Sequence, residues 1–381
     1  MVKKIGRIIR YIQKIIFAKK QIKKYSKSKM KITGNPCLFI THNLGGGTEN
    51  FVSNFLKEHN KENIYILRNL SYVYDLCYVL EEVKTGEKKG FKNFEEFCLF
   101  ISNVKWKKIL INSLVSYYNW DKLLSFLRKL KKQNREILIE YFLHDFHCIC
   151  PGRNLIKDNN YCNLNCKNNN CSFDKHAYTD YIDIRYWHTK WQLFFDFVDT
   201  IYSFSESSKE IFLQIYRHNN IQVRPHSMDY CHFKPIKLQK QNLHIGIVGT
   251  IKGAAKGCYI VREFLELCKK NNICVTVVGE LQKDCIVKGD NILITGKYKI
   301  SELGHILEEN GINAIFFTSI CPETFSYLVS ELMFLDIPIF SFNIGAQGEK
   351  IRNYEKGMVF PLNTDISHIL EIISNYFYDH N

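Results

Sequence analysis

Short apolar runs alternate with helix-type repeats along two long stretches of this sequence. An apolar run of strand length is typical of a strand buried on both faces, and alternation with helices favours parallel pairing. The alternation therefore predicts an α/β protein with two doubly wound sheets. In the first series we expect strands at 37–41, 63–68, 107–112 and 136–143, and helices at 48–58, 93–103 and 120–132. In the second we expect strands at 243–249, 274–279, 314–318 and 338–342, and helices at 258–270, 301–309, 324–335 and 366–376.

The two series set the expected domain boundaries. Residues 1–31 precede the first series, 32–224 contain it, and 243–381 contain the second. The segment 225–242 is polar and basic with two prolines, which is typical of an interdomain linker. In two such domains that face a cleft, the carboxyl ends of the strands lie at that cleft. We therefore expect ligands to meet the loops that follow the strands.

The positive charge of the chain is concentrated in the arm 1–31. The formal net charge is +14, but twelve of the 52 lysine and arginine residues precede Glu49, the first acidic residue. The other basic residues nearly balance the 38 acidic ones. The charge of the whole chain therefore says little about the partners of the folded domains.

Residues 3–16 of the arm have the pattern of an amphipathic basic helix. At about 100° per residue the isoleucines fall within an arc of about 120°, and the cations lie opposite. Such a helix can lie in the headgroup region of an anionic membrane surface, and the basic run 19–31 would extend the contact. The alternative is that the isoleucine face packs on the first domain. Nucleic acid fits less well, because an isoleucine stripe has no purpose there. The isoleucines are Ile5, Ile8, Ile9, Ile12, Ile15 and Ile16, and the cations are Lys3, Lys4, Arg7, Arg10 and Lys14.

The cysteines and the apolar stretches indicate the compartment. The 14 cysteines are scattered through apolar runs, which is typical of buried thiols in a reducing compartment rather than of a disulfide framework. No apolar stretch has the length of a secretory signal or of a membrane-spanning helix. We therefore expect a cytoplasmic protein that is peripheral on the inner face of the cell membrane.

Two glutamates mark the segment 321–331 as a candidate site. Glu323 and Glu331 have Glu-x7-Glu spacing after a predicted strand, so they lie about two turns apart on nearly one helix face. The free N–H groups at a helix start suit an anion such as a phosphate. Carboxylates accept hydrogen bonds, so the pair suits the hydroxyls of a sugar and of a ribose.

The residues around these glutamates resemble the retaining glycosyltransferases of the GT-B fold that build bacterial surface polysaccharides. The resemblance rests on 322–331, 336–339 and 343–349, and it extends to 247–249, 256–257 and 41–49. It covers roughly 37–376 and is strongest from Leu243 onward. It implies two Rossmann-like domains facing a cleft, with an acceptor domain at 32–224 and a nucleotide-sugar domain at 243–381.

The resemblance also implies roles for the residues of the second domain. Glu331 would hold the ribose of the donor and Glu323 the transferred sugar. The backbone of Thr324, Phe325 and Ser326 would lie beside the diphosphate.

Two cations usually bind the leaving diphosphate in this family. Lys256 matches one of them, but Thr250 stands where the family commonly has an arginine. We expect Lys252, in the same loop, to replace the missing charge.

In the first domain the candidate residues are two glycines and a histidine. Gly46 and Gly47 belong to a glycine-rich turn between a strand and a helix, where the backbone can approach a ligand closely. A tight turn alone is the alternative. His144 ends the strand 136–143, and the resemblance implies that it touches the donor sugar. His147 is the local rival.

A cysteine-rich loop spans 148–176. Cys150, Cys162, Cys166 and Cys171, with His176 downstream, offer enough ligands for a tetrahedral structural zinc. The spacing is not that of a standard zinc knuckle, and free loop thiols are the alternative. The resembling subgroup carries a similar cysteine-bearing loop.

The resemblance implies transfer of a sugar from a nucleotide-sugar donor to a saccharide or lipid-linked acceptor, with retention of configuration. The leaving diphosphate would itself take the proton of the acceptor hydroxyl, so no cofactor is required for catalysis. A nucleotide-sugar epimerase of the same fold and a non-catalytic partner subunit of a glycosyltransferase are the alternatives. A dehydrogenase is disfavoured because the G-x-G-x-x-G fingerprint fails at Asn50.

Overall fold

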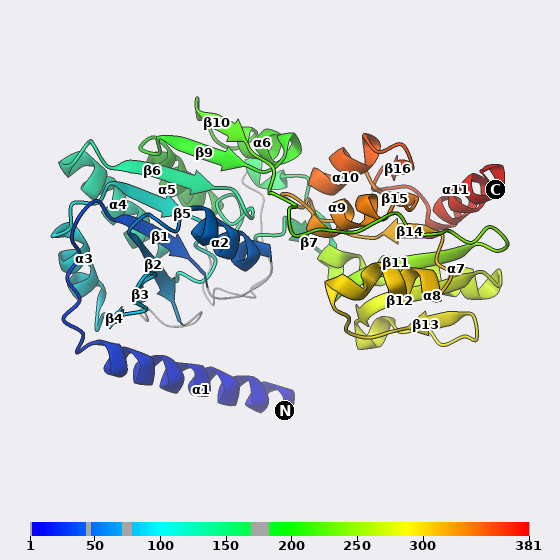
Figure 1. The fold of residues 1–381 in the computed structure, drawn as a ribbon, viewed down its shortest axis with the longest axis horizontal. Coiled ribbons are helices and arrows are strands. Elements are labelled where there is room, and N and C mark those ends of the chain that lie inside the picture. Colours follow the sequence, from blue (N-terminus) through cyan, green and yellow to red (C-terminus); the bar gives the residue numbers. More distant parts are fainter. Residues whose placement is uncertain (1, 43–46, 71–77, 169–182, 381) are drawn as a thin grey trace. The chain divides into compact units, whose positions relative to one another are not determined.

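Two separate sheets organise the chain in the computed structural model, which describes residues 2–42, 47–70, 78–168 and 183–380 (Figure 1). The chain divides into two units, one around each sheet. The first unit comprises Met1–Arg153, Asn165–Phe204 and Lys209–Arg224, and the second comprises Asn154–Leu164, Ser205–Ser208 and Pro225–Asn381.

The sheet of the first unit has the strand order β10-β9-β6-β5-β1-β2-β3-β4. Its pairs are parallel except β2 with β3 and β3 with β4, which are antiparallel. The strands are β1 (Cys37–Thr41), β2 (Ile64–Asn69), β3 (Tyr78–Glu82), β4 (Lys88–Gly90), β5 (Lys108–Ile111), β6 (Leu138–Phe142), β9 (Thr200–Ser203) and β10 (Ile221–Val223). The helices are α1 (Val2–Tyr25), α2 (Gly47–Glu58), α3 (Phe94–Ser102), α4 (Trp120–Gln133), α5 (Ile184–Phe195) and α6 (Glu206–Leu213), the last of which crosses a unit boundary.

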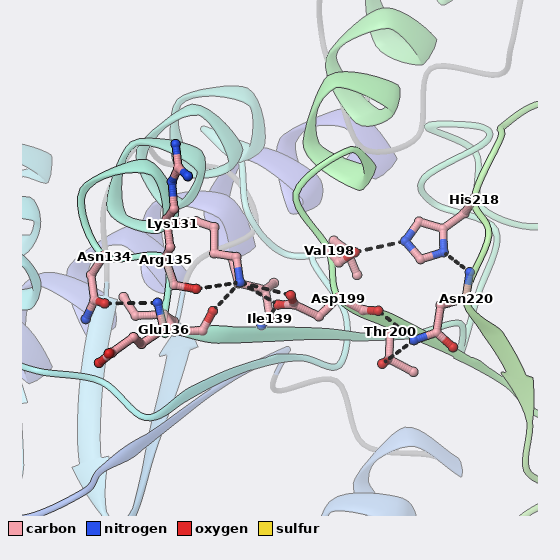
Figure 2. Close-up of polar contacts among 11 residues, drawn as sticks. Lys131, Asn134, Arg135, Glu136, Ile139, Val198, Asp199, Thr200, His218 and Asn220 are labelled. Carbon is pink, nitrogen blue, oxygen red and sulfur yellow. Dashed lines mark hydrogen bonds and ion pairs between the residues drawn. The ribbon is translucent and has the colours of Figure 1, made fainter.

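A polar network fixes one end of the first sheet (Figure 2). Lys131 of α4 donates to both carboxylate oxygens of Asp199 at 2.9 Å and to the carbonyl of Ile137 at 2.6 Å. The carboxylate of Asp199 also accepts the backbone N–H of Ile139 at 2.7 Å. These groups lie at the amino ends of β6 and β9, opposite the carboxyl ends where ligands bind in such sheets. The network therefore connects α4 to the sheet and leaves the ligand-binding edge free of it.

The sheet of the second unit is entirely parallel, in the order β13-β12-β11-β14-β15-β16. Its strands are β11 (His244–Ile251), β12 (Cys274–Leu281), β13 (Ile292–Ile294), β14 (Ala314–Phe317), β15 (Ile339–Phe342) and β16 (Gly357–Phe360). Its helices are α7 (Cys258–Lys270), α8 (Leu303–Glu309), α9 (Tyr327–Phe334), α10 (Gly345–Arg352) and α11 (Ile366–Asp379). The hairpin β7–β8 (Ile156–Lys157 and Asn160–Tyr161) also belongs to this unit.

Two apolar cores cover the two faces of the second sheet. Phe316 of β14 packs in the core that contains Phe264 of α7. Its neighbour Ile315 packs in the core that contains Val329 of α9. Successive residues of a strand point to opposite faces, so a strand buried on both sides must be apolar throughout. This confirms the predicted α/β fold with doubly wound sheets.

Every strand that the alternation predicts is present, within two residues at each end. The predicted helix at 324–335 begins only at Tyr327, and this part of the prediction is wrong. The reason is Ser326, whose φ of 60° lies in the left-handed region and is incompatible with a right-handed helix. The loop 322–326 therefore approaches α9 in a non-helical conformation.

The segment 225–242, which we expected to be a linker, packs on the second unit. Phe233, Ile236 and Leu238 contact one of its two apolar cores. The backbone N–H of Ile236 donates to the carbonyl of Leu335 at 3.0 Å. The apolar residues of this segment therefore extend the second unit beyond the boundary expected at 243.

Helix α1 packs at the β4 edge of the first sheet through its carboxyl-terminal half (Figure 1). Ala18 is fully buried, and Gly90 of β4 lies so close that an added Cβ would stand 3.1 Å from the carbonyl oxygen of Ile22. By contrast, Ile12 and Ile16 are about half exposed, at 48% and 49%. Ile12 and Ile16 thus lie off the packed face of the helix. Among the described helices, none is both long and apolar enough to cross a membrane.

Candidate functional site

The candidate site of the second unit is built around an ion pair between Glu323 and Lys256. Glu323 lies in the loop after β14, and Lys256 ends a short 3-10 turn (Ala254–Lys256) after β11. Gly257 makes their approach possible, because its φ is 74° and a Cβ there would lie 2.1 Å from the carbonyl oxygen of Thr318. The loops after two adjacent strands therefore meet as the sequence predicts.

A second close backbone approach holds Glu323 from the other side. Gly345, at the start of α10, has a φ of 59°, and a Cβ there would lie 2.6 Å from the backbone nitrogen of Glu323. Gln347 accepts the N–H of Glu323 at 2.9 Å and donates to the carbonyl of Cys321 at 2.7 Å. The loop is thus fixed by α10 as well as by α9.

The ion pair keeps both of its members charged. Burial is the largest single influence and raises the pKa of Glu323, but the charge and hydrogen bond of Lys256, together with Ser326 and Lys350, outweigh it, and the pKa falls below its ordinary value. Burial likewise lowers the pKa of Lys256, but the carboxylate of Glu323 more than compensates, and the pKa is raised. The side chain of Lys256 remains 44% exposed, so its charge is accessible to a ligand.

Glu331 lies one to two turns into α9 and is buried, with 6% of its surface exposed. The hydroxyl of Tyr230, from the segment 225–242, donates to its Oε1 at 2.6 Å. Burial raises the pKa of Glu331, and the hydrogen bond from Tyr230 and the charge of Lys350 oppose this rise. Sequence reasoning missed Tyr230, because nothing local connects it with a residue so far along the chain.

The residues 324–326 form the turn that precedes α9. Phe325 and Ser326 are buried, and Phe325 contacts the rings of Tyr327 and His226. Ser326 is the N-cap residue, and its side chain makes no capping hydrogen bond to the helix. The N–H groups of the first turn of α9 therefore depend on another acceptor, which an anionic ligand can supply.

Lys350 of α10 reaches this turn, although nothing in the sequence pattern singled it out. Its Nζ donates to Ser330 Oγ at 2.6 Å and to the carbonyl of Ser326 at 3.3 Å. It also lies 3.3 Å from the centre of the Phe325 ring.

Lys252, the expected substitute for the missing arginine, pairs with Glu280 at 2.8 Å. The pairing follows from the sheet, because Thr250 of β11 lies in register with Glu280 of β12. The side chain of Lys252 is 52% exposed. Lys256 and Lys252 thus have different carboxylate partners, Glu323 for the first and Glu280 for the second.

The candidate residues of the first unit have aromatic surroundings. His144 follows β6, and its ring centre lies 4.4 Å from that of Phe204 and 4.5 Å from that of Phe51. Its rival His147 is buried, and burial lowers its pKa to about 4, so the ring is neutral at physiological pH. Gly47 begins α2, whereas Gly46 lies outside the described residues.

The comparisons with known proteins were made by sequence and by structure. No family model and no curated protein matches the sequence. Among solved structures, sucrose-phosphate synthase from Thermosynechococcus elongatus matches 91% of this chain and 90% of its own, with 13% identity and a TM-score of 0.59. The lipopolysaccharide outer core galactosyltransferase WaaB matches 91% of each chain, with 13% identity and a TM-score of 0.58. HepE of Anabaena, solved with UDP and glucose, matches 91% of each chain, with 14% identity and a TM-score of 0.56.

The chain has the GT-B fold. The two doubly wound sheets described above are the two halves of that fold, and the segment 225–242 connects them. The sequence resemblance therefore predicted the fold class correctly.

The cysteine-rich loop lies partly outside the described residues. Cys150, Cys162 and Cys166 are buried, whereas Cys171 and His176 fall in the segment 169–182 that the structure does not describe. In the described parts of the chain, no three histidine, cysteine or acidic side chains are grouped so that they could hold a metal ion. The structural zinc stays a prediction.

Proposed function

We propose that this chain is a retaining glycosyltransferase that uses a nucleotide-sugar donor. The observation that carries the proposal is the ion pair of Glu323 with Lys256 beside the uncapped start of α9, with Glu331 buried about one turn into that helix. The GT-B fold supports it, and so do the structural neighbours, of which one is a galactosyltransferase and another was solved with UDP and glucose.

The charges of the site suit a sugar bound to a nucleoside diphosphate. Lys256 and the N–H groups of 324–326 would face the diphosphate, and Glu323 a hydroxyl of the transferred sugar. Because Tyr230 occupies Oε1 of Glu331, the other carboxylate oxygen would accept a ribose hydroxyl. His144 of the first unit would contact the transferred sugar, and the backbone of Gly46 and Gly47 the donor.

The reaction that fits these groups breaks the bond between the anomeric carbon and the diphosphate and forms a bond from that carbon to the acceptor oxygen. The acceptor hydroxyl gives its proton to the departing diphosphate, on the same face of the sugar. Lys256 and the start of α9 stabilise the negative charge that develops on the diphosphate. The chain thus contributes position and charge, and the chemistry needs no cofactor.

One observation favours a second candidate. Thr250 leaves the diphosphate without the usual arginine, and Lys252 is paired with Glu280. A non-catalytic partner subunit of a glycosyltransferase would tolerate that loss. It would bind the donor weakly and would not turn it over.

We also propose that α1 lies on the anionic inner face of the cell membrane and brings the site near a lipid-linked saccharide acceptor. Ala18 and Ile22 hold the helix on the first sheet, and at about 100° per residue they lie roughly 120° around the helix from Ile12 and Ile16. Ile12 and Ile16 are thus available to another partner. The basic residues of 1–31 supply charge complementary to anionic lipids.

The experiment that tests the main proposal is a screen of purified full-length chain against UDP-, GDP- and dTDP-sugars. We expect one nucleotide class to raise the melting temperature and to be hydrolysed slowly. Glu331→Ala should abolish the thermal shift, whereas Glu323→Gln should lower turnover more than donor affinity. A thermal shift without turnover would favour the partner subunit, and the absence of both would overturn the proposal.

A further inference from the structure

Lys350 occupies a position that the proposed chemistry does not yet use. It belongs to α10, yet its amine lies at the start of α9, where it bonds to Ser326 and Ser330 and covers the ring of Phe325. Ser326 and Ser330 are the first and last residues of one helical turn. A single amine therefore connects both ends of that turn with a neighbouring helix.

The turn that Lys350 contacts is conformationally demanding. Ser326 has a φ of 60°, which a residue with a side chain adopts only where its surroundings hold it there. Its carbonyl is the group that receives the N–H···O bond from Lys350. The amine therefore stabilises the backbone orientation that ends the loop 322–326 and begins α9.

The same amine faces the acidic groups of the site. Glu323 from the loop, Glu331 from α9 and Glu349 from α10 all act on Lys350 electrostatically. His226, from the segment 225–242, also faces it, and burial together with the charge of Lys350 lowers the pKa of His226 to about 3. Because His226 is neutral, it does not balance the negative charge of Glu323 and Glu331. Lys350 of α10 supplies the positive charge that does so.

We propose that Lys350 is a positioning residue of the donor site, which holds the turn at 325–326 and balances the charge of Glu323 and Glu331, so that this turn and Glu331 face the nucleoside diphosphate part of the donor correctly. This inference rests on the proposed function. It assigns to α10 a part in donor binding through a side chain that need not touch the donor.

The charge of Lys350 makes the role testable by pH. Burial lowers its pKa to about 7, although the three glutamates oppose this effect. The amine therefore loses its proton as the pH rises through about 7, and donor affinity should fall over that range.

The contribution of Lys350 to fold stability should increase over the same pH range. Between about pH 7 and the ordinary lysine pKa the unfolded chain binds the additional proton, so this group makes the free energy of unfolding rise with pH. A loss of affinity there is then not a loss of folding.

The experiment measures the dissociation constants of UDP, GDP and dTDP by calorimetry from pH 6 to 8.5, on full-length wild type, Lys350→Met and Lys350→Arg. Arg352→Met, at the exposed end of the same helix, is the matched control. For the nucleotide that binds, we expect Lys350→Met to weaken binding about tenfold at pH 6.5 and to remove the decline in affinity above about pH 7. Lys350→Arg should keep the affinity and remove the alkaline decline, because arginine stays charged. It carries the test even if Lys350→Met fails to fold.

Unchanged affinity and pH dependence in Lys350→Met, or an alkaline decline that persists in Lys350→Arg, would overturn the inference and leave the proposed function standing. If wild type binds none of the three nucleotides, the proposed function fails and takes this inference with it.

Discussion

The residues that we propose to contact the donor have different surroundings in the two units. In the second unit they contact one another, as in the pair of Lys256 with Glu323 and the hydrogen bond from Tyr230 to Glu331. In the first unit, His144 packs against the rings of Phe51 and Phe204. A preformed set of charges suits a charged ligand, and a histidine among rings suits a neutral one. The contrast concerns His144 and not the whole edge, because the edge of the first sheet also holds polar contacts, such as that from Ser113 to Asp145 at 2.8 Å.

The largest effect that would test this comparison is expected at Lys256. Lys256→Ala should lower kcat/KM for the nucleotide sugar about 30- to 1,000-fold, or about 2 to 4 kcal/mol, which is the usual cost of losing one preorganised group that stabilises transition-state charge. Steady-state kinetics on the donor found in the screen measure it. Lys252→Ala is the matched comparison, and a silent Lys252→Ala would show that Lys252 does not replace the missing arginine. A change below threefold in Lys256→Ala would contradict the charge-defined site.

Tyr230→Phe tests the hydrogen bond to Glu331. Burial already raises the pKa of Glu331, and removing the hydroxyl of Tyr230, which donates a hydrogen bond to this carboxylate, should raise the pKa further. As the solution is acidified, the variant should therefore lose affinity for the nucleotide sugar at a higher pH than wild type does. At neutral pH its affinity should be about tenfold lower, which is about the cost of losing a hydrogen bond to a charged group. Titration of donor affinity between pH 4 and 8 measures both changes. An acid limb identical to that of wild type would separate Tyr230 from the site.

The histidines of the first unit give a contrast within one loop. His144→Ala should lower kcat about tenfold and leave donor affinity nearly unchanged, because the neutral sugar contact matters most as the bond breaks. His147→Ala should instead lower the melting temperature, because the ring is buried and its loss leaves a cavity. Kinetics and thermal denaturation of both variants distinguish the two roles. If His147→Ala lowers kcat at unchanged stability, the rival is the functional residue.

The smallest effect is expected for the arm. Replacing both Ile12 and Ile16 by Ser should weaken flotation with phosphatidylglycerol vesicles severalfold, even at low salt, because insertion and not only attraction is removed. Raising the salt should weaken wild type as well, because charge attraction is screened within about 8 to 10 Å. Leu99→Ser, at a 67% exposed position on α3, is the control for apolar surface elsewhere. Equal flotation of wild type and the double variant would remove the membrane role.

The sequence predicted β1, β2, β5, β6, β11, β12, β14 and β15, but it did not predict β3, β4, β9, β10, β13 and β16. A strand buried on both faces needs apolar residues throughout, so β1, β11 and β14 stood out. The hairpin strand β4 has two lysines and one glycine in three residues, and its place follows from pairing with β3 and from contact with α1. Local pattern carries no such tertiary information.

The candidate site shows the same division. Glu323, Glu331 and Lys256 were found because a motif holds them at fixed spacing. Tyr230 and Lys350 were missed because their partners lie on other elements, and their importance comes from burial and charge that only folding creates. The start of α9 was misplaced because Ser326, a residue without a general preference for the left-handed region, adopts it here.

The hydrogen bond from Tyr230 to Glu331 also has a thermodynamic consequence. Tyr230 belongs to the stretch of chain that runs between the two sheets, and Glu331 is the carboxylate assigned to the donor. Coupling free energies are reciprocal. Any effect of the packing of this stretch on ribose binding, transmitted through Tyr230, therefore equals the effect of ribose binding on that packing. If Glu331 binds the ribose as we propose, a strain applied to the segment 225–242 changes nucleotide affinity, and nucleotide binding changes the packing of that segment.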